Sequence, residues 1–376
     1  MKVILPVAGA GTRLRPFTLT RPKCLLPIAG KTLLEHIFDS FNGLDVSQKI
    51  LVVGVLSEKI YEYSEKKSWK DVGFVEQNNP EGLGQAIALC DSFLKDDEPV
   101  LIILGDTLFK TDLSFLAHAE TNVLFTRVVE DPRRFGVVVK DETGKVTKLV
   151  EKPKEFVSDE ALVGIYYIRD TAALRQSLKY LLENNIRTRG EFQLTDALQK
   201  MVEDGSEFRT ALLDSWLDCG TPEMLLETNG TLLAEKHAKV PFEGKSSTII
   251  PPCFIGENIE IVDSVIGPNV SLENGCRVIS SKVTNALVGE NSEIENLKRD
   301  DLNVVQEDLL SAGYLSQSSI DNKIDEFSSA INKLNNFTSE IPEFENNDDN
   351  NDNIEEETEI EEELINSSNS HEDAEN

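Results

Sequence analysis

The stretch Val3–Pro16, VILPVAGAGTRLRP, decides how the N-terminal part of this chain is interpreted. It starts with a short apolar run that is typical of a buried parallel strand. A glycine-containing turn follows, then Arg13, and Lys23 comes ten residues later. Because open α/β sheets bind ligands in the loops after such strands, the stretch predicts an α/β fold with a ligand site at its first loop.

The same region is a basic island in an acidic protein. The first 34 residues hold six Lys or Arg and no Asp or Glu, whereas the 376-residue chain has a formal net charge of −30. Glycines let backbone N–H groups approach phosphate oxygens, and two cations neutralise their charge. We therefore expect a site for a small polyanionic phosphate compound. The alternative is a surface turn with incidental charges.

Charge and cysteine usage exclude other classes of protein. Residues 340–376 hold 16 of the 67 acidic residues and no Lys or Arg, and the rest of the chain is still acidic. This composition disfavours nucleic acid and anionic membranes as partners. The five cysteines form no Cys-x-x-Cys pair and the four histidines are scattered, so we expect free thiols and no zinc site.

The chain shows no signal-peptide pattern and no apolar run long enough to span a membrane, so we expect a cytoplasmic protein. Cys24 and Cys219 adjoin candidate site residues, but no histidine is placed to activate them. We expect neither thiol to be a nucleophile.

Up to about residue 221, apolar runs alternate with amphipathic segments. This βαβ rhythm predicts a Rossmann-like, mostly parallel sheet covered by helices, within a first domain at 1–240. We expect strands at 50–55, 72–76, 100–104, 123–129, 137–139 and 161–168, and helices at 32–41, 83–94, 171–182, 191–203 and, as a connection, 222–239.

Residues 241–298 have a different pattern. The unit Ile255-Gly256-Glu257-Asn258 recurs in similar form at 266 and 288, and apolar residues recur about every six positions. This pattern resembles a hexapeptide left-handed β-helix, although two ordinary hairpins are an alternative. The repeat pattern itself covers the 49 residues 249–297, which make fewer than three coils of about 18 residues each. We therefore expect the coils to pack on the first domain or on another subunit.

The remaining residues divide into a linker at 299–339 and an acidic tail at 340–376. Apolar residues from Ile320 to Leu334 alternate at spacings of four and three, which is typical of either a short oligomerising helix or a chance amphipathic stretch. The tail is rich in Asn, Asp and Glu, so we expect it to be disordered.

Two carboxylates far apart in the sequence follow apolar runs. Asp106 comes after the predicted strand at 100–104, at the edge where ligands bind, and Asp218 follows an apolar pair. Two carboxylates that face a triphosphate form a Mg²⁺ site, since this ion typically takes one or two carboxylates together with substrate phosphates. The alternative is that each Asp only caps a turn.

The stretches Gly9–Pro16 and Pro22–Pro27 resemble the signature of sugar-1-phosphate nucleotidylyltransferases, and the similarity continues in order to about residue 297. Ala8 stands where that family usually has a glycine, but the charged positions match. The resemblance implies Mg²⁺ at Asp106 and Asp218 and catalytic roles for Arg13 and Lys23. It also implies nucleotide binding by Ala8, Gly9, Gly11 and Thr12.

The resemblance extends to the substrate-binding segments. It implies that Gln77 and Gly82 hold a pyrimidine base, and glutamine offers the donor and the acceptor that the imide edge of thymine or uracil needs. We therefore expect dTTP first and UTP second, with glucose-1-phosphate as the sugar substrate. The residues that it implies at the sugar phosphate are Gly136, Glu151, Lys152, Arg189 and Glu191.

The implied reaction is direct displacement at the α-phosphorus, with catalysis by positioning and charge neutralisation. One alternative is a non-catalytic regulatory or scaffold subunit that binds nucleotide sugar, but the charged site residues are all present. An acetyl-transferring β-helix is a further alternative, although no histidine lies between His237 and His371. We expect a homo-oligomer that binds only small-molecule substrates.

Overall fold

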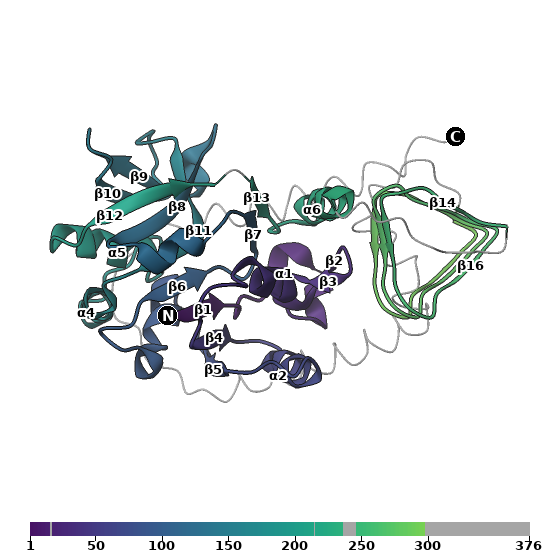
Figure 1. The fold of residues 1–376 in the computed structure, drawn as a ribbon, viewed down its shortest axis with the longest axis horizontal. Coiled ribbons are helices and arrows are strands. Elements are labelled where there is room, and N and C mark those ends of the chain that lie inside the picture. Colours follow the sequence, from purple (N-terminus) through teal and green to yellow (C-terminus); the bar gives the residue numbers. More distant parts are fainter. Residues whose placement is uncertain (16, 214, 236–245, 298–376) are drawn as a thin grey trace, which may run out of the picture. The chain divides into compact units, whose positions relative to one another are not determined.

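A nine-stranded sheet lies at the centre of the first 235 residues (Figure 1). The computed structural model describes residues 1–15, 17–213, 215–235 and 246–297. The strand order is β10-β9-β11-β6-β1-β4-β5, and β8 pairs with both β11 and β12. The strands are β1 (Lys2–Pro6), β4 (Gln48–Val53), β5 (Val72–Glu76), β6 (Val100–Ile103), β8 (Asn122–Val128), β9 (Gly136–Lys140), β10 (Val146–Glu151), β11 (Glu160–Ile168) and β12 (Phe208–Leu212).

The sheet is parallel in its first half and mixed in its second. Strands β6, β1, β4 and β5 are parallel neighbours, as predicted, and β12 is parallel to β8. However, β11 is antiparallel to β6, β8 and β9, and β10 is antiparallel to β9. The prediction of a mostly parallel sheet is therefore wrong for this half. The turn between β9 and β10, where Asp141 accepts from the backbone N–H groups of Thr143 and Lys145, is too short to join parallel strands.

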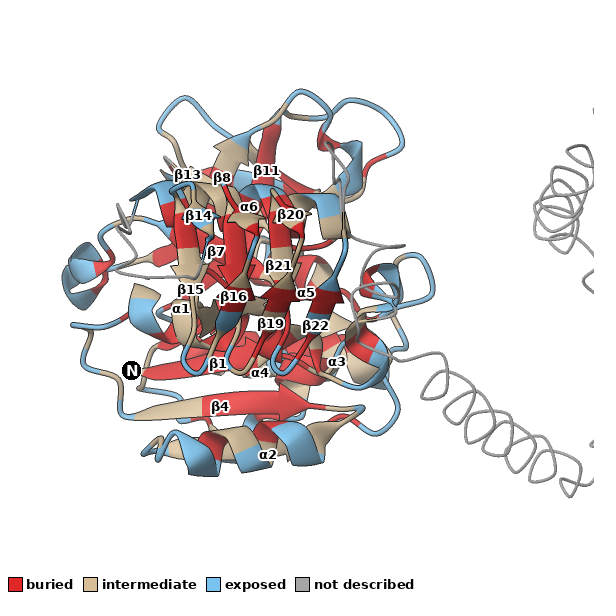
Figure 2. Cartoon of the chain, turned by 90° about the vertical axis from the view of Figure 1, so that its right-hand side faces the viewer, coloured by how far each residue is buried: buried red, intermediate tan, exposed pale blue. Residues whose placement is uncertain are grey.

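Alternating side chains of the strands pack into two apolar cores, one on each face of the sheet. Val3 and Leu5 belong to the first cluster, whereas Ile4 belongs to the second, and the sheet strands are largely buried (Figure 2). Helix α1 packs on the first face and helices α4 and α5 on the second. The α-helices of the described residues are α1 (Leu33–Ser40), α2 (Ser57–Lys66), α3 (Leu83–Ala88), α4 (Thr171–Glu183), α5 (Leu194–Glu203) and α6 (Pro222–Glu235).

Helix boundaries differ from the sequence prediction at two places. The helix expected at 83–94 ends at Ala88 and is followed by a 3₁₀ turn, Asp91–Phe93. The helix expected at 191–203 starts at Leu194, because Glu191 instead forms a β-bridge with Thr188. The helix expected at 222–239 is described as far as Glu235. The linker and tail expected at 299–376 lie outside the described residues.

Residues 246–297 form three parallel sheets of three strands each, arranged on three sides of a coil (Figure 1). Paired residues are 16 or 17 positions apart, as in Cys253↔Val270 and Val270↔Ala286. Parallel pairing excludes the two hairpins. The strands are β14 (Thr248–Ile249), β17 (Val265–Ile266) and β20 (Lys282–Val283), then β15 (Cys253–Ile255), β18 (Val270–Leu272) and β21 (Ala286–Val288), and β16 (Glu260–Val262), β19 (Arg277–Ile279) and β22 (Glu293–Glu295).

Apolar side chains fill the coil. Ile261, Val278 and Ile294 occupy matching positions on three successive strands and are almost fully buried. The coil also contacts the first domain, because α6 touches β18 and β21 and because Phe254 and Leu287 pack against the first core cluster. The expected packing of the coil on the first domain is confirmed within the described residues.

Glu273 of the coil predicts a pH-dependent stability. The pKa of Glu273 is raised from 4.5 to about 7, mainly by burial and also by Glu290 and Glu35, while Arg21 opposes the shift. The folded protein thus keeps a proton that the unfolded chain releases between pH 4.5 and 7, so stability falls as the pH rises through that window. We expect Glu273→Gln to raise the free energy of unfolding by about 1–3 kcal/mol at pH 8, and by much less at pH 5.

Urea unfolding at the two pH values measures this effect. Glu293→Gln, at an exposed position of the same coil, is the matched control and is expected to change stability little at either pH. An equal effect of Glu273→Gln at both pH values would contradict the assignment.

Candidate active site

Four charged side chains meet beyond the carboxyl ends of β1 and β6. Asp106 follows β6, and its Oδ2 atom lies 2.6 Å from Lys23 Nζ. Asp218 ends β13 (Ser215–Asp218), which is antiparallel to β7 (Thr107–Lys110), and Asp218 is paired with Thr107. The backbone N–H of Cys219 donates to the carbonyl of Asp106 at 3.1 Å. This strand pair brings the two carboxylates together, as the sequence predicted.

Arg13 joins this cluster from the first loop. A Cβ atom added to Gly220 would lie 2.9 Å from Asp218 Oδ1 and 3.3 Å from Arg13 Nη2, so both side chains flank Gly220. The loop needs a glycine at Gly11, whose φ is 62°, and a Cβ there would lie 2.9 Å from the methyl carbon of Thr18. We call Arg13, Lys23, Asp106 and Asp218 the charge cluster.

The charge cluster carries unrelieved repulsion between its carboxylates. Burial raises the pKa of Asp218, Asp106 raises it further, and Lys23 and Arg13 lower it again without cancelling the shift. An additional cation would relieve this repulsion, so the donor set fits Mg²⁺. No group of three or more His, Cys, Asp or Glu side chains that could hold a metal occurs among the described residues, so substrate phosphates would have to complete the shell of such an ion.

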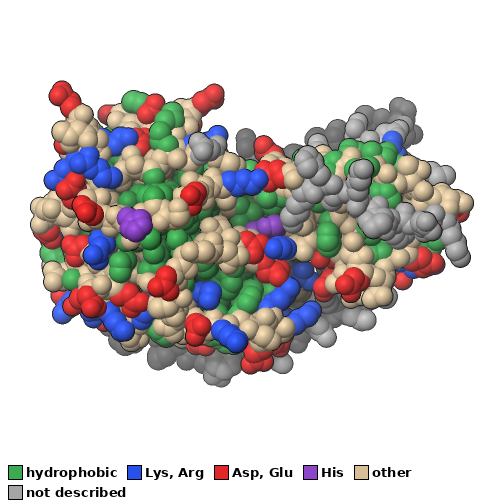
Figure 3. Space-filling view, in the orientation of Figure 1, with side chains coloured by type: hydrophobic (Ala, Val, Ile, Leu, Met, Phe, Trp, Pro, Cys, Tyr) green, Lys and Arg blue, Asp and Glu red, His purple; other side chains and the backbone are tan. Residues whose placement is uncertain are grey.

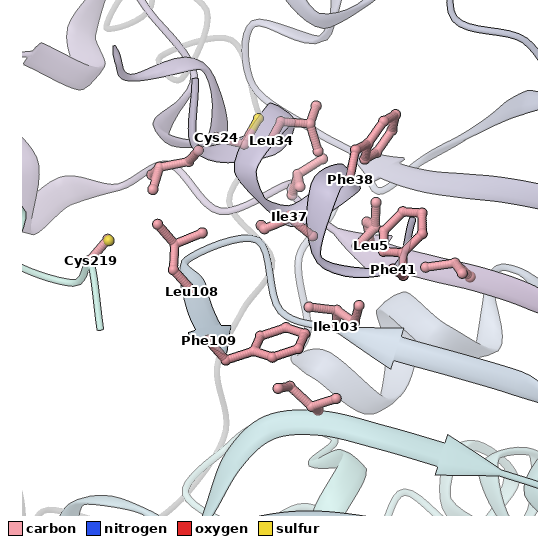
Figure 4. Packing of buried hydrophobic residues seen from close by; sticks show 14 of the residues in the cluster. Leu5, Cys24, Leu34, Ile37, Phe38, Phe41, Ile103, Leu108, Phe109 and Cys219 are labelled. Carbon is pink, nitrogen blue, oxygen red and sulfur yellow. The ribbon is translucent and has the colours of Figure 1, made fainter. Parts of the chain in front are cut away.

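Cys24 and Cys219, which directly follow Lys23 and Asp218 in the sequence, are buried in the core. Both cysteines are outside any disulfide and are buried in the first apolar cluster, which also contains Leu108 and Leu34 of α1 (Figure 4). Burial raises the pKa of each thiol to about 12, which keeps it protonated at neutral pH. This agrees with the expectation that neither is a nucleophile.

The loop after β5 holds Gln77 and Gly82 close together. Gln77 is 7% exposed, and its Nε2 donates to Gln85 Oε1 at 2.7 Å and to the Gly82 carbonyl at 3.3 Å. Gly82 has φ 114°, and a Cβ there would lie 2.6 Å from the Phe192 carbonyl oxygen. Sequence reasoning missed Gln85, although its position in the first turn of α3 places it back over this loop.

A second group of predicted residues surrounds Glu151. Gly136 and Glu151 are directly paired between β9 and β10. Glu151 Oε2 accepts from Thr195 Oγ1 at 2.7 Å, and Lys152 Nζ lies 3.4 Å from Glu151 Oε1. Sequence reasoning did not assign Thr195, because a threonine on a helix gives no signal by itself.

Arg189 and Glu191 lie on a tight turn closed by backbone hydrogen bonds between Thr188 and Glu191. Arg189 has φ 54°, and its Nη2 donates to the carbonyl of Lys152 at 2.9 Å, which joins it to the Glu151 group. Glu191 instead lies against the other loop, since a Cβ on Gly82 would be 2.9 Å from Glu191 Cβ. The turn therefore links the two predicted substrate regions.

The described residues form no extended basic field on the face drawn in Figure 3. On the face drawn in Figure 3, Lys and Arg side chains are interspersed with Asp and Glu. This pattern gives no indication of a nucleic-acid interface. In the described part of the chain, no helix has the length and apolar character needed to cross a membrane.

Comparisons with known proteins agree with this geometry. Residues 2–235 match the family model of nucleotidyl transferases. The chain is 29% identical over 327 residues to glucose-1-phosphate thymidylyltransferase of Streptomyces antibioticus, which covers 80% of this chain and 90% of that protein. It is 35% identical over 269 residues to bifunctional protein GlmU of Methanococcus maripaludis, which covers 71% of this chain and 60% of that protein.

A solved structure of UDP-glucose pyrophosphorylase with UDP-glucose shares the fold. The two structures have a TM-score of 0.52 and 23% sequence identity, and the match covers 62% of this chain and 98% of that one.

Proposed function

The chain belongs to the nucleotidyl transferase family, and from that premise we propose that it transfers a thymidylyl group from dTTP to glucose-1-phosphate and releases pyrophosphate. UTP is the second candidate donor. Nucleotidyl transfer to a sugar-1-phosphate is the activity that the family and its relatives support. The observation that carries the proposal is the charge cluster, with Lys23 2.6 Å from Asp106 and with Arg13 and Asp218 beside it.

The reaction is a displacement at phosphorus. A phosphate oxygen of the sugar-1-phosphate forms a bond to the α-phosphorus, and the bond from that phosphorus to the bridging oxygen breaks. Pyrophosphate leaves with the electron pair, so no proton or covalent enzyme intermediate is needed. Because both reactants are anions, the chain must mainly position them and neutralise their charge.

Each member of the charge cluster has a role in this displacement. Arg13 and Lys23 would hold the triphosphate and stabilise the charge that develops on pyrophosphate. Asp106 and Asp218 would hold Mg²⁺, which supplies charge neutralisation and polarises phosphate oxygens. Lys23 pairs with Asp106 without substrate, so it would exchange part of that contact for a phosphate oxygen.

The loops on either side would hold the nucleotide. Ala8, Gly9, Gly11 and Thr12 would lie along the nucleotide, and Gln77 and Gly82 would face the base. Support comes from the burial of Gln77 and from its hydrogen bonds to Gln85 and Gly82, which fix its amide. Because the Gln77 Nε2 donates to both of these partners, its Oε1 would accept from the imide N–H of thymine or uracil.

The Glu151 group would hold the sugar phosphate. Glu151 would accept from sugar hydroxyls near Gly136, and Lys152 and Arg189 would bind the phosphate. Glu191 would form the wall between sugar and base. Support comes from the Thr195–Glu151 bond, which fixes the carboxylate, and from the Arg189 contact with the Lys152 carbonyl.

We also propose that residues 241–298 form a left-handed hexapeptide β-helix after a catalytic domain at 1–240, in a cytoplasmic homo-oligomer. The three parallel sheets, with pairings 16 or 17 residues apart, support the β-helix. A crystal structure tests the handedness of the coil, and sedimentation tests the oligomer.

A substrate panel tests the proposed function. Purified full-length chain with Mg²⁺ is given each of dTTP, UTP, GTP, CTP and ATP with glucose-1-phosphate or N-acetylglucosamine-1-phosphate, and pyrophosphate release is measured. We expect dTTP and UTP to exceed the purine nucleotides by about tenfold or more. Release with purine nucleotides alone would contradict the base-binding role of Gln77 and Gly82. Silence with every pair would contradict the enzyme and favour the non-catalytic subunit.

A further inference from the structure

Asn229 of α6 connects three separate parts of the chain. Its side chain is fully buried. The Oδ1 atom accepts from the backbone N–H of Ala29 at 3.0 Å and from Ser271 Oγ at 2.7 Å, and Nδ2 donates to the Asn269 carbonyl at 3.1 Å. Because buried amides need well-placed partners, these bonds fix the position of the first domain against the coil.

The first-domain partner is the turn of a small hairpin. Ala29 and Gly30 join β2 (Pro27–Ile28) to β3 (Lys31–Thr32) and have φ values of 49° and 81°, which are typical of a tight hairpin turn. The coil contacts this turn directly, since a Cβ on Gly30 would lie 2.3 Å from a ring carbon of Phe254. The turn is therefore held by Asn229 of α6 and by Phe254 of the coil.

This turn adjoins the Lys23 segment. Lys23 opens a 3₁₀ turn, Lys23–Leu25, and the next residue, Leu26, accepts through its carbonyl from the N–H of Leu33 at 3.1 Å. The hairpin that carries Ala29 is thus tied at its base to the turn that carries Lys23.

The residue before Asn229 contacts the segment that carries Asp218. Thr228 is 1% exposed, and its Oγ1 lies 3.7 Å from the Sγ of Cys219, which directly follows Asp218. Adjacent residues of α6 therefore hold the two segments that supply Lys23 and Asp218, and one of them also holds the coil.

We propose that Asn229 is a positioning residue through which the coil fixes the Lys23 segment against the Asp218 segment. This inference rests on the proposed function, because the fixed spacing matters for charge neutralisation during nucleotidyl transfer. The coil then contributes to catalysis by fixing the positions of these two segments. Displacements of about 1 Å in such a cluster lower the rate, whereas groups that bind the substrates elsewhere are unaffected.

Hydrogen exchange and kinetics of the full chain test this role. Ser271→Ala removes one hydroxyl that donates to Asn229, and Asn229→Ala removes all three bonds. The matched control is Ser281→Ala, because Ser281 is also a buried serine of the coil. Its hydroxyl donates to the Ile279 carbonyl and accepts from the Leu297 N–H, and both partners lie within the coil. We expect Ser271→Ala to speed exchange in residues 26–33 about tenfold and to lower kcat about 3- to 30-fold with KM nearly constant.

The other outcomes test the link between coil and hairpin separately from the positioning role. Exchange in Ser271→Ala equal to that in Ser281→Ala would overturn the link between coil and hairpin. Faster exchange with unchanged kcat would overturn the positioning role. If the unaltered chain shows no nucleotidyl transfer, the proposed function fails on its own, and the exchange comparison still decides the link. Should Asn229→Ala fail to fold, Ser271→Ala carries the test.

Discussion

Replacing Arg13 by alanine is expected to lower kcat about 100- to 1,000-fold, the range for loss of one donor that stabilises developing charge. The reason is that Arg13 lies beside Asp218 at the charge cluster, where it would stabilise the departing pyrophosphate. Its side chain is exposed, so the change in the free energy of unfolding is expected to stay within about 0.5 kcal/mol. Steady-state kinetics and thermal unfolding of the same preparation measure both effects.

The matched control for Arg13 is an arginine outside the charge cluster. Arg277 on the coil is 43% exposed and pairs with Glu260, and such surface ion pairs contribute little. We expect Arg277→Ala to keep near-normal kcat. Unchanged turnover in Arg13→Ala, or an equal loss in both variants, would remove Arg13 from the mechanism.

Asp218→Asn is expected to lower activity about 100-fold or more and yet to stabilise the metal-free protein by about 1 kcal/mol. Burial and Asp106 raise the pKa of Asp218 above its ordinary 3.8, so the ionised side chain opposes folding at neutral pH. Asparagine keeps the shape and removes the charge. The gain is present at pH 7 and disappears as the pH falls below 3.8, where Asp218 is protonated in both states.

Thermal unfolding with and without Mg²⁺ measures this prediction, and Asp106→Asn is the comparison. Asp106→Asn removes the ion-pair partner of Lys23, so we expect it to give no stabilisation. Mg²⁺ should raise the melting temperature of the unaltered chain by more than that of Asp218→Asn. A destabilised Asp218→Asn that keeps the full Mg²⁺ shift would contradict the assignment of Asp218 to the ion.

Local patterns predicted much of the first domain. The apolar runs of β1 and of β6, expected at 100–104, lie where hydrophobicity placed them, because a buried strand must be apolar along its length. The reversal at β11 was not predictable in this way. Strand direction follows from which strands pair, and the pattern of one strand does not contain that information.

Some residues of the candidate site could likewise be named from the sequence, and others could not. Arg13 and Lys23 could be named from the glycine-containing turn and its basic island, and Asp106 and Asp218 from their positions after apolar runs. The sequence could not name the residues that fix the site, because their roles depend on contacts between distant segments. Gln85 bonds to Gln77, Thr195 bonds to Glu151, and Asn229 bonds to Ala29. Glu191 shows the limit for a named residue, because it was predicted at the sugar phosphate whereas its turn places it beside Gly82.

The most direct test of the central claim follows the α-phosphate itself. The full-length chain is incubated with Mg²⁺, glucose-1-phosphate and dTTP or UTP labelled at the α-phosphorus, and the products are separated. The account predicts that the label enters a sugar nucleotide in equal amount to the pyrophosphate released, and only when the sugar phosphate is present. Label that remains in the triphosphate, or that appears as nucleoside monophosphate whether or not sugar phosphate is added, would contradict it.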